Sequence, residues 1–313
     1  MPMQTLFERL DEAATDTDPA GSSDEAAARR LESTGRFRIL RQLEHRPVRA
    51  RMTDADHAGL RLGIVVDVET TGLDKDCAEV IEVGAVAFTY AADGIRDVVG
   101  EYSGLEQPTR PLSREISRLT GLTDPELAGR NIDRAALAAL VRPADIVVAH
   151  NSAFDRGFCE KLDPIFATKT WVCSATDIDW KGLGEPVAKL GNLLASAGRF
   201  HGAHRALTDC HAVLEVLAAP AWDGPEGAFA QLLAAAVTEM FEIRAEGAPY
   251  SARGMLKNAG YRWDAGGPGR AKSWYKIVPR DRAPDEESFC RREIYRTGGA
   301  PVVRRIPSGE RFR

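Results

Sequence analysis

The sequence predicts an α/β fold in which a mixed sheet is flanked by helices and followed by a small basic C-terminal module. Apolar, β-branched runs of strand length come first, and segments with helical spacing follow them. The final stretch is rich in Gly, Arg and aromatic residues. At 313 residues the chain is long enough for one main domain and an appendage. We expect an acidic N-terminal segment with one helix, a main domain, a connecting helix and the module, at residues 1–60, 61–222, 223–248 and 249–313.

Composition narrows the class of protein. Hydrophobic residues make up 44% and charged residues 28%, which is typical of a soluble globular protein. No run approaches the ~18 apolar residues of a membrane span, and the N-terminus lacks the pattern of a secretory signal. The cysteines are odd in number and never spaced C-x-x-C, so we expect no disulfide framework and a cytoplasmic location. They are Cys77, Cys159, Cys173, Cys210 and Cys290.

The net charge of −5 hides an asymmetry. Residues 244–313 hold 16 Lys and Arg against 8 Asp and Glu, a balance of +8, so the rest of the chain carries 25 − 38 = −13. An acidic body with a basic tail suits an enzyme whose carboxylates hold metal ions and whose tail attracts phosphate.

The first half of the main domain has strand character. Residues 1–23 are expected to be disordered, and Ser23-Asp24 could cap a helix that Gly35 weakens. Three strands with short connections then predict an antiparallel meander, at residues 62–69, 80–90 and 95–102.

The second half alternates helices with short strands. We expect helices at 113–119, 133–141, 152–162, 187–197 and 205–217, and strands at 145–149 and 169–173. Gly224-Pro225 is expected to begin one more helix that runs to about residue 246.

Asp67 and Glu69 lie two residues apart in a strand otherwise made of Ile and Val. Strand alternation puts both side chains on one face of the sheet. Two adjacent carboxylates repel each other and lose solvation there unless a positive charge lies between them. The alternative is a strand end at which both acids reach water.

Asp155 follows a second buried strand by a polar turn, and lies in the first turn of the next helix. In α/β sheets, ligands bind at this carboxyl edge. Taken alone, Asp155 could equally be an acid favoured by the helix dipole.

His204 and Asp209 provide a third segment. They converge if His204 lies on the loop before a helix and Asp209 lies one turn inside it. The alternative is that Asp209 only balances Arg205. Four carboxylates from three segments are the ligand set for two hard divalent cations, Mg²⁺ or Mn²⁺, and a mobile histidine suits a general base.

The motifs together resemble the DEDDh 3′–5′ exonucleases, the family of the proofreading epsilon subunit of bacterial DNA polymerase III and of freestanding epsilon-like exonucleases. The resemblance covers about residues 60–220 and rests on DVETTGL at 67–73, IEVGAV at 81–86, LTGLT at 119–123, AHNSAFD at 149–155 and HRALTD at 204–209.

This resemblance implies a ribonuclease-H-like fold and roles for individual residues. It implies metal ligands at Asp67, Glu69, Asp155 and Asp209, with His204 as the general base. Thr70 and Thr71 would hold the terminal nucleotide, and Leu73 would wedge against its base. His150, Asn151 and Phe154 are also expected at the substrate, with His150 and Asn151 orienting the turn before Asp155.

Two further groups of residues suggest other sites. His201, His204, Cys210 and His211 crowd into eleven residues, which leaves zinc as a minor alternative. In the tail, Tyr261-Arg262-Trp263 and a later run with Trp274 and Lys276 could stack on unpaired bases and grip phosphates. The alternative for these aromatic residues is a core of their own.

The sequence therefore predicts a metal-dependent 3′–5′ exonuclease that acts on single-stranded nucleic-acid ends, with DNA favoured. An RNA-trimming exoribonuclease and a non-catalytic nucleic-acid-binding accessory protein remain alternatives. A replication or repair protein is a possible partner, and the sequence predicts no oligomeric state.

Overall fold

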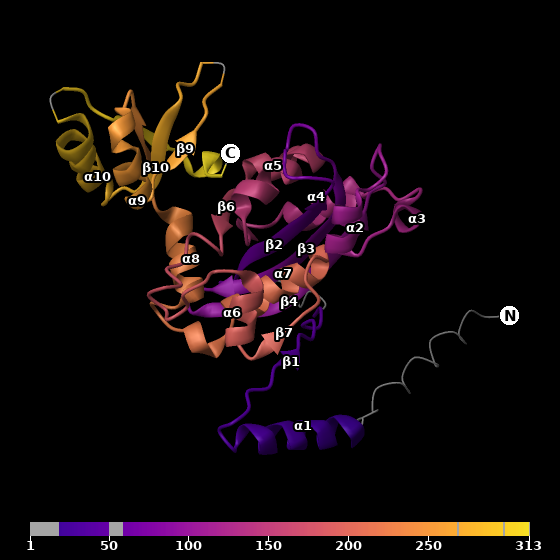
Figure 1. Ribbon diagram of the computed structural model, residues 1–313. Coiled ribbons are helices and arrows are strands. Elements are labelled where there is room, and N and C mark those ends of the chain that lie inside the picture. The colour runs from indigo at the N-terminus through magenta and orange to yellow at the C-terminus, as the bar shows by residue number, and fades with distance from the viewer. Residues whose placement is uncertain (1–18, 50–58, 268, 297, 313) are drawn as a thin grey trace.

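The computed structural model describes residues 19–49, 59–267, 269–296 and 298–312. A main domain around a five-stranded sheet is followed by a C-terminal module, which we define as residues 240–312, on the far side of helix α8 (Figure 1). No helix among these residues is long and apolar enough to cross a membrane. The segment expected to be disordered lies largely outside the described residues.

The sheet of the main domain has the strand order β4-β3-β2-β5-β6. Strands β2, β3 and β4 form the predicted antiparallel meander, and β5 and β6 add to β2 in parallel. The bounds are β2 Arg61–Thr70, β3 Val80–Ala91, β4 Gly94–Leu105, β5 Ile146–Ala149 and β6 Thr170–Cys173. The expected mixed α/β sheet is confirmed.

Helices cover both faces of this sheet. Strand alternation sends Val65 into a core with α6, α7 and α8, while Val66 packs on the other face with α4 and α5. The bounds are α2 Arg114–Thr120, α3 Asp124–Leu127, α4 Arg134–Val141, α5 Ser152–Leu162, α6 Leu190–Ser196, α7 Ala206–Leu217 and α8 Ala228–Val237. Ser113 and Asp133 cap α2 and α4 by accepting backbone N–H groups.

The N-terminal segment crosses one edge of the main domain. Helix α1, Pro19–Glu32, ends before Gly35, which has a φ of 69°. Strand β1, Arg41–Gln42, pairs in parallel with β7, Arg199–Phe200, and Val48 bridges to Val98 on edge strand β4. The segment therefore runs from β7 to β4.

The C-terminal module has the strand order β11-β8-β10-β9, with α9 and α10 packed on one face. The bounds are β8 Met240–Glu246, α9 Arg253–Asn258, β9 Arg262–Asp264, β10 Ser273–Pro279, α10 Ala283–Phe289 and β11 Val302–Ile306. The expected helix to residue 246 is wrong, because α8 ends at Val237 and β8 pairs with both β10 and β11.

The end of the chain returns to the main domain. Arg311 is buried and its guanidinium lies 2.5 Å from Asp177. Arg156 of α5 donates to the backbone carbonyls of Gly309 and Arg311. These contacts fix the module against the main domain at a second point besides α8.

Candidate active site

Asp67 and Glu69 lie on the face of β2 that meets α7, as strand alternation predicts. Glu69 is 9% exposed and Asp67 is partly buried. The acids are therefore not a strand end open to water, and their charges must be balanced within the site.

Asp155 approaches the same strand from α5. It is 2% exposed, and its Oδ1 accepts the backbone N–H of Val68 at 3.3 Å. This bond holds the Asp155 carboxylate beside the strand position between Asp67 and Glu69. The polar turn after β5 therefore brings the third acid to the first two.

Asp209 lies in the first turn of α7, and His204 lies on the loop before that helix. Oδ2 of Asp209 accepts the backbone N–H of His204 at 2.9 Å, and Oδ1 accepts from Nε2 of His201 at 2.5 Å. His204 has a φ of 67°, a left-handed conformation that non-glycine residues seldom adopt. The loop conformation leaves its side chain exposed.

Glu82 and Gly84 of β3 position the start of α7, a role that the sequence analysis did not assign. Glu82 is buried and bonds Arg205 at 3.2 Å and the N–H of Ala206 at 3.3 Å. Arg205 therefore pairs with Glu82, not with Asp209. A Cβ at Gly84, which pairs with Asp67 across the sheet, would overlap the backbone of Ala206.

Burial and mutual repulsion change the acidity of the carboxyl groups. Burial, followed by the charges of Asp155 and Asp209, raises the pKa of Asp67 well above its usual range. Burial, followed by the charge of Asp209, raises the pKa of Glu69 to about 8. Burial raises the pKa of Asp155 to about 7, although the Val68 N–H opposes the shift. The site is therefore short of positive charge.

The donor set fits divalent metal ions. Carboxylate or imidazole atoms of Glu69, His204 and Asp209 lie within 4.8 Å of one another, and Asp67 and Asp155 adjoin them. Oxygen-rich sites of this kind suit Mg²⁺ and Mn²⁺. A bound cation would remove the repulsion that raises the carboxyl pKa values.

Comparison with known proteins places these residues in a family. A family model described as exonuclease matches residues 64–217, a span that contains Asp67, Glu69, Asp155, His204 and Asp209. The domain belongs to the exonuclease family. Its mixed sheet flanked by helices agrees with the ribonuclease-H-like fold that the resemblance implied.

Each of the following relatives matches only part of this chain. A PolC-type DNA polymerase III of Thermotoga maritima is 34% identical over 137 residues, which are 43% of this chain and 9% of the relative. The DNA polymerase III epsilon subunit of Treponema pallidum is 28% identical over 159 residues, which are 48% and 72% of the two chains. A solved exonuclease I structure has 17% identity and a TM-score of 0.47, and the match covers 80% of this chain and 63% of that one. The chain therefore spans less than a tenth of the PolC-type relative.

The turn after β2 leads out of the exonuclease site. The Thr70 hydroxyl donates to the carbonyl of Gly72 at 2.6 Å, and the Thr71 hydroxyl accepts the N–H of Glu79 at 2.9 Å. These bonds fix the turn. Leu73 lies at the end of this turn and is 86% exposed, so its apolar side chain is available to a ligand.

The turn before Asp155 is held by His150. Its Nδ1 bonds the Ser174 hydroxyl at 2.9 Å and its Nε2 bonds the carbonyl of Ala188 at 2.8 Å. Asn151 is exposed at the N-cap of α5, and Phe154 packs on Phe158 with ring centroids 5.0 Å apart. The two bonds of His150 tie this turn to Ser174 and Ala188, whereas the Asn151 side chain makes no capping hydrogen bond.

The residues of the zinc alternative do not converge. Cys210 is fully buried in the core under the sheet. His211 points to Glu101 on β4, while His201 and His204 bond Asp209 on the other side of α7. These side chains therefore leave α7 in different directions, because adjacent helix positions diverge by about 100°.

The aromatic residues of the C-terminal module divide into two groups. Tyr261 is buried in its core, Trp274 packs partly against that core, and Lys276 pairs with Glu286 of α10. Trp263 is 54% exposed, and its ring centroid lies 5.6 Å from that of Trp274. Of these two tryptophans Trp263 is the accessible one, although the sequence did not assign it to the site.

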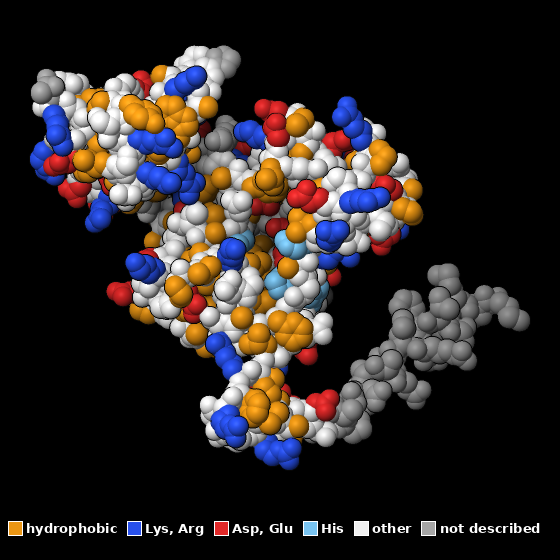
Figure 2. All heavy atoms as spheres, viewed as in Figure 1, with side chains coloured by type: hydrophobic (Ala, Val, Ile, Leu, Met, Phe, Trp, Pro, Cys, Tyr) orange, Lys and Arg blue, Asp and Glu red, His pale blue; other side chains and the backbone are white. Residues whose placement is uncertain are grey.

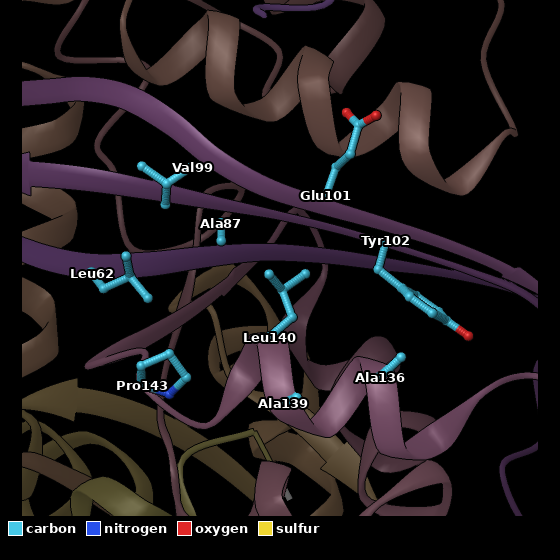
Figure 3. A pocket seen from close by; sticks show the side chains of 9 residues that line it. All are labelled: Leu62, Ala87, Val99, Glu101, Tyr102, Ala136, Ala139, Leu140 and Pro143. Atoms are coloured by element: carbon cyan, nitrogen blue, oxygen red, sulfur yellow. The ribbon is translucent and has the colours of Figure 1, made fainter. Parts of the chain in front are cut away.

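A hollow of about 380 Å³ lies between β4 and α4 (Figure 3). Its lining is mainly aliphatic, including Leu62, Leu140 and Pro143, and it contains none of the five catalytic candidates. The candidate active site at the end of β2 is therefore separate from this hollow.

The raised carboxyl pKa values predict that the stability of the metal-free protein depends on pH. Asp155 and Glu69 bind protons more tightly in the folded state than their ordinary values of 3.8 and 4.5 allow. The stabilisation from this protonation is complete below about pH 4 and is lost as pH rises through about 7–8. We expect the metal-free Tm to fall between about pH 5 and pH 8, and Mn²⁺ to raise it more at the higher pH.

Thermal unfolding in chelator and in Mn²⁺ at several pH values measures both effects. Asp155→Asn is the matched variant, because an amide oxygen can still accept the Val68 N–H while the titrating group is removed. Its metal-free Tm should depend less on pH. A wild-type Tm that rises over the same interval, with a Mn²⁺ effect independent of pH, would contradict the electrostatic description.

Proposed function

We propose that this chain is a 3′–5′ exonuclease that hydrolyses nucleotides from single-stranded DNA ends. The observation that carries the proposal is the convergence of four carboxylates from β2, α5 and α7 on one site. Burial raises the pKa of Asp67, Glu69 and Asp155, and repulsion between the acids adds to the shift of Asp67 and Glu69. Asp67, Glu69, Asp155 and Asp209 would hold two Mg²⁺ or Mn²⁺ ions. Two such ions would stabilise charge on the attacking and leaving oxygens of the phosphodiester.

His204 is the residue that we assign to proton transfer. Its side chain is exposed beside Glu69 and Asp209, on a loop whose backbone is fixed by the bond to Asp209. Histidine is the side chain used most often as a general base. His204 would take the proton of the attacking water, and the bond that breaks is between phosphorus and the 3′ oxygen of the preceding nucleotide.

The two turns beside the site are suited to positioning the terminal nucleotide. We assign backbone and hydroxyl contacts to Thr70 and Thr71, and contact with the terminal base to the exposed Leu73. Phe154 and Asn151 lie at the start of α5 on the other side of the carboxylates, and His150 holds that turn in place.

A single assay tests the activity and its rivals. Matched single-stranded DNA, duplex DNA and RNA, each with a 5′ label, are digested with and without Mg²⁺. We expect metal-dependent ladders that shorten from the 3′ end, with single-stranded DNA degraded fastest. Faster digestion of RNA would favour an exoribonuclease, and binding without cleavage would favour an accessory protein.

We also propose a replication or repair setting, because relatives are named DNA polymerase III, and a cytoplasmic location.

The C-terminal module is proposed to hold the substrate strand. Lysine and arginine side chains gather beside hydrophobic ones over α9, β9 and β10, on the face that also shows histidines near β2 and α7 (Figure 2). Trp263 lies opposite Trp274 in the β9–β10 pair, and Lys272 immediately precedes β10. Lys272 is exposed with no ion pair among the described residues, so it is available to phosphate. We also propose that Trp274 and Lys276 belong to this substrate-binding surface, where both are less exposed than Trp263.

Trp263→Ala is therefore expected to weaken substrate binding without slowing chemistry. Stacking contributes about 1–3 kcal/mol per base, so KM for long single strands should rise about 5- to 100-fold with kcat nearly unchanged. Steady-state kinetics on strands of several lengths at several salt concentrations measures this effect.

Trp274→Ala is the matched control, because its ring packs against the core of the module. It should lower Tm more than Trp263→Ala does. Truncation near Glu246 is not a clean test, since it removes β10 and β11 from β8. If Trp263→Ala matches the wild-type KM at every strand length and salt concentration, the exposed ring does not bind the substrate.

A further inference from the structure

A second group of metal-ligating side chains lies outside the catalytic site. His45 of the N-terminal segment, Glu101 of β4 and His211 of α7 place one potential ligand atom each within 4.8 Å of one another. Nε2 of His211 lies 3.3 Å from Oε2 of Glu101. The rings of His45 and His211 are stacked, with centroids 3.9 Å apart and an angle of 13° between their planes.

This group is separate from the carboxylates that hold the catalytic ions. His211 follows Asp209 by two residues on α7, so the two side chains point about 160° apart around the helix axis. Glu101 lies on the face of β4 opposite Tyr102, and Figure 3 shows its carboxylate directed away from the hollow between β4 and α4. The side of the sheet that Glu101 faces carries α7.

The chemistry of the three side chains suits a transition-metal ion better than Mg²⁺. Two imidazoles and one carboxylate are a donor set used for Zn²⁺, with a fourth position left to water, whereas Mg²⁺ prefers oxygen ligands alone. Arg46, the nearby cation, is paired with Glu215 at 3.2 Å.

His211 is the buried member of the group, and its Nε2 faces Glu101. Its side chain is 1% exposed, and its Nδ1 has no hydrogen-bond partner among the described residues. His45 is exposed, so its ring can turn from the stacked position towards an ion while His211 stays fixed.

We propose that His45, Glu101 and His211 bind one Zn²⁺-like divalent transition-metal ion. The ion connects the N-terminal segment to β4 and α7. Around this point the segment is held by the two-residue pairing of β1 with β7, the Val48–Val98 bridge and the Arg46–Glu215 pair. The bound ion therefore stabilises the position of residues 41–49 on the exonuclease domain, and it does so independently of the catalytic reaction.

Metal titration of the full chain tests the site. Protein stripped with chelator is dialysed into excess Mg²⁺ to occupy the carboxylate site, and is then titrated with Zn²⁺ by calorimetry and with Co²⁺ by visible absorption. We expect a Zn²⁺-binding event that persists in Mg²⁺, and a Co²⁺ spectrum with imidazole ligands. His45→Ala should weaken this event at least tenfold, since even partners of metal ligands cost about 10- to 100-fold in affinity.

Two variants distinguish this site from the catalytic carboxylates and from nonspecific binding at the surface. Glu44→Ala removes the exposed neighbour of His45 and should leave Zn²⁺ binding unchanged. Asp67→Ala disables the catalytic carboxylates and should retain the event, which would show that it does not belong to the nuclease site. Equal Zn²⁺ stoichiometry, affinity and Tm increase in the wild type and in His45→Ala would overturn the proposal, whether or not the protein degrades DNA.

Discussion

Asp67→Ala is expected to reduce cleavage of single-stranded DNA by at least about 10³-fold, because a metal ligand that stabilises transition-state charge contributes several kcal/mol. Asp155→Ala should have a comparable effect, although it comes from a different segment. Both side chains meet at the middle of the site, where the Val68 N–H holds Asp155 beside the β2 acids. Single-turnover digestion with a 5′-labelled strand measures the loss.

The stability of the same variants shows whether the loss is catalytic. Asp67 is one of several carboxylates whose proximity raises their pKa values, so its removal should relieve repulsion in the metal-free protein. We expect the metal-free Tm of Asp67→Ala to equal or exceed that of the wild type near neutral pH, and the Tm increase caused by Mn²⁺ to shrink. Asp76→Ala, an exposed acid on the turn after β2, is the matched control and should cleave normally. An Asp67→Ala protein that cleaves at the wild-type rate would show that the active site is wrongly assigned.

His204→Ala is expected to slow turnover by about 10²–10⁴-fold while metal binding persists, because we assign this residue to proton transfer. His204→Asn is the better-matched variant, since asparagine tolerates the positive φ of this position and alanine adds strain. Turnover should fall by the same factor in the two variants. If the Tm of His204→Ala is lower than that of His204→Asn, the difference would then reflect only the strain that alanine adds to the loop.

Calorimetric Mn²⁺ titration decides between two roles for His204. Its imidazole lies within 4.8 Å of the ligand atoms of Glu69 and Asp209, so a ligand role is a geometric alternative. If His204 acts as a base, its replacement should leave the Mn²⁺ affinity nearly unchanged while kcat falls. Mn²⁺ binding that disappears in His204→Asn would make the residue a ligand and exclude the assigned role.

Most of the main domain could be predicted from the sequence by itself, because its elements depend on local chemistry. Period-two alternation identifies β2 and puts Asp67 and Glu69 on one face, and Ser113 and Asp133 mark helix starts by their capping bonds. The strand, polar turn and helix around Asp155 are equally local. These features depend on neighbours within a few residues, so the pattern of side chains is enough to predict them.

The tertiary structure decided what depends on distant partners. Residues 240–246 continue a helical-looking run, yet they form β8 because β10 and β11 supply hydrogen bonds from later in the chain. Arg205 could pair with Asp209 one turn away, but the buried Glu82 of β3 accepts it instead, which leaves Asp209 to His201 and the His204 backbone. Which tryptophan is accessible likewise depends on the packing of β9 and β10 against the module core. Each outcome is set by burial or pairing across many residues, and no local pattern contains that information.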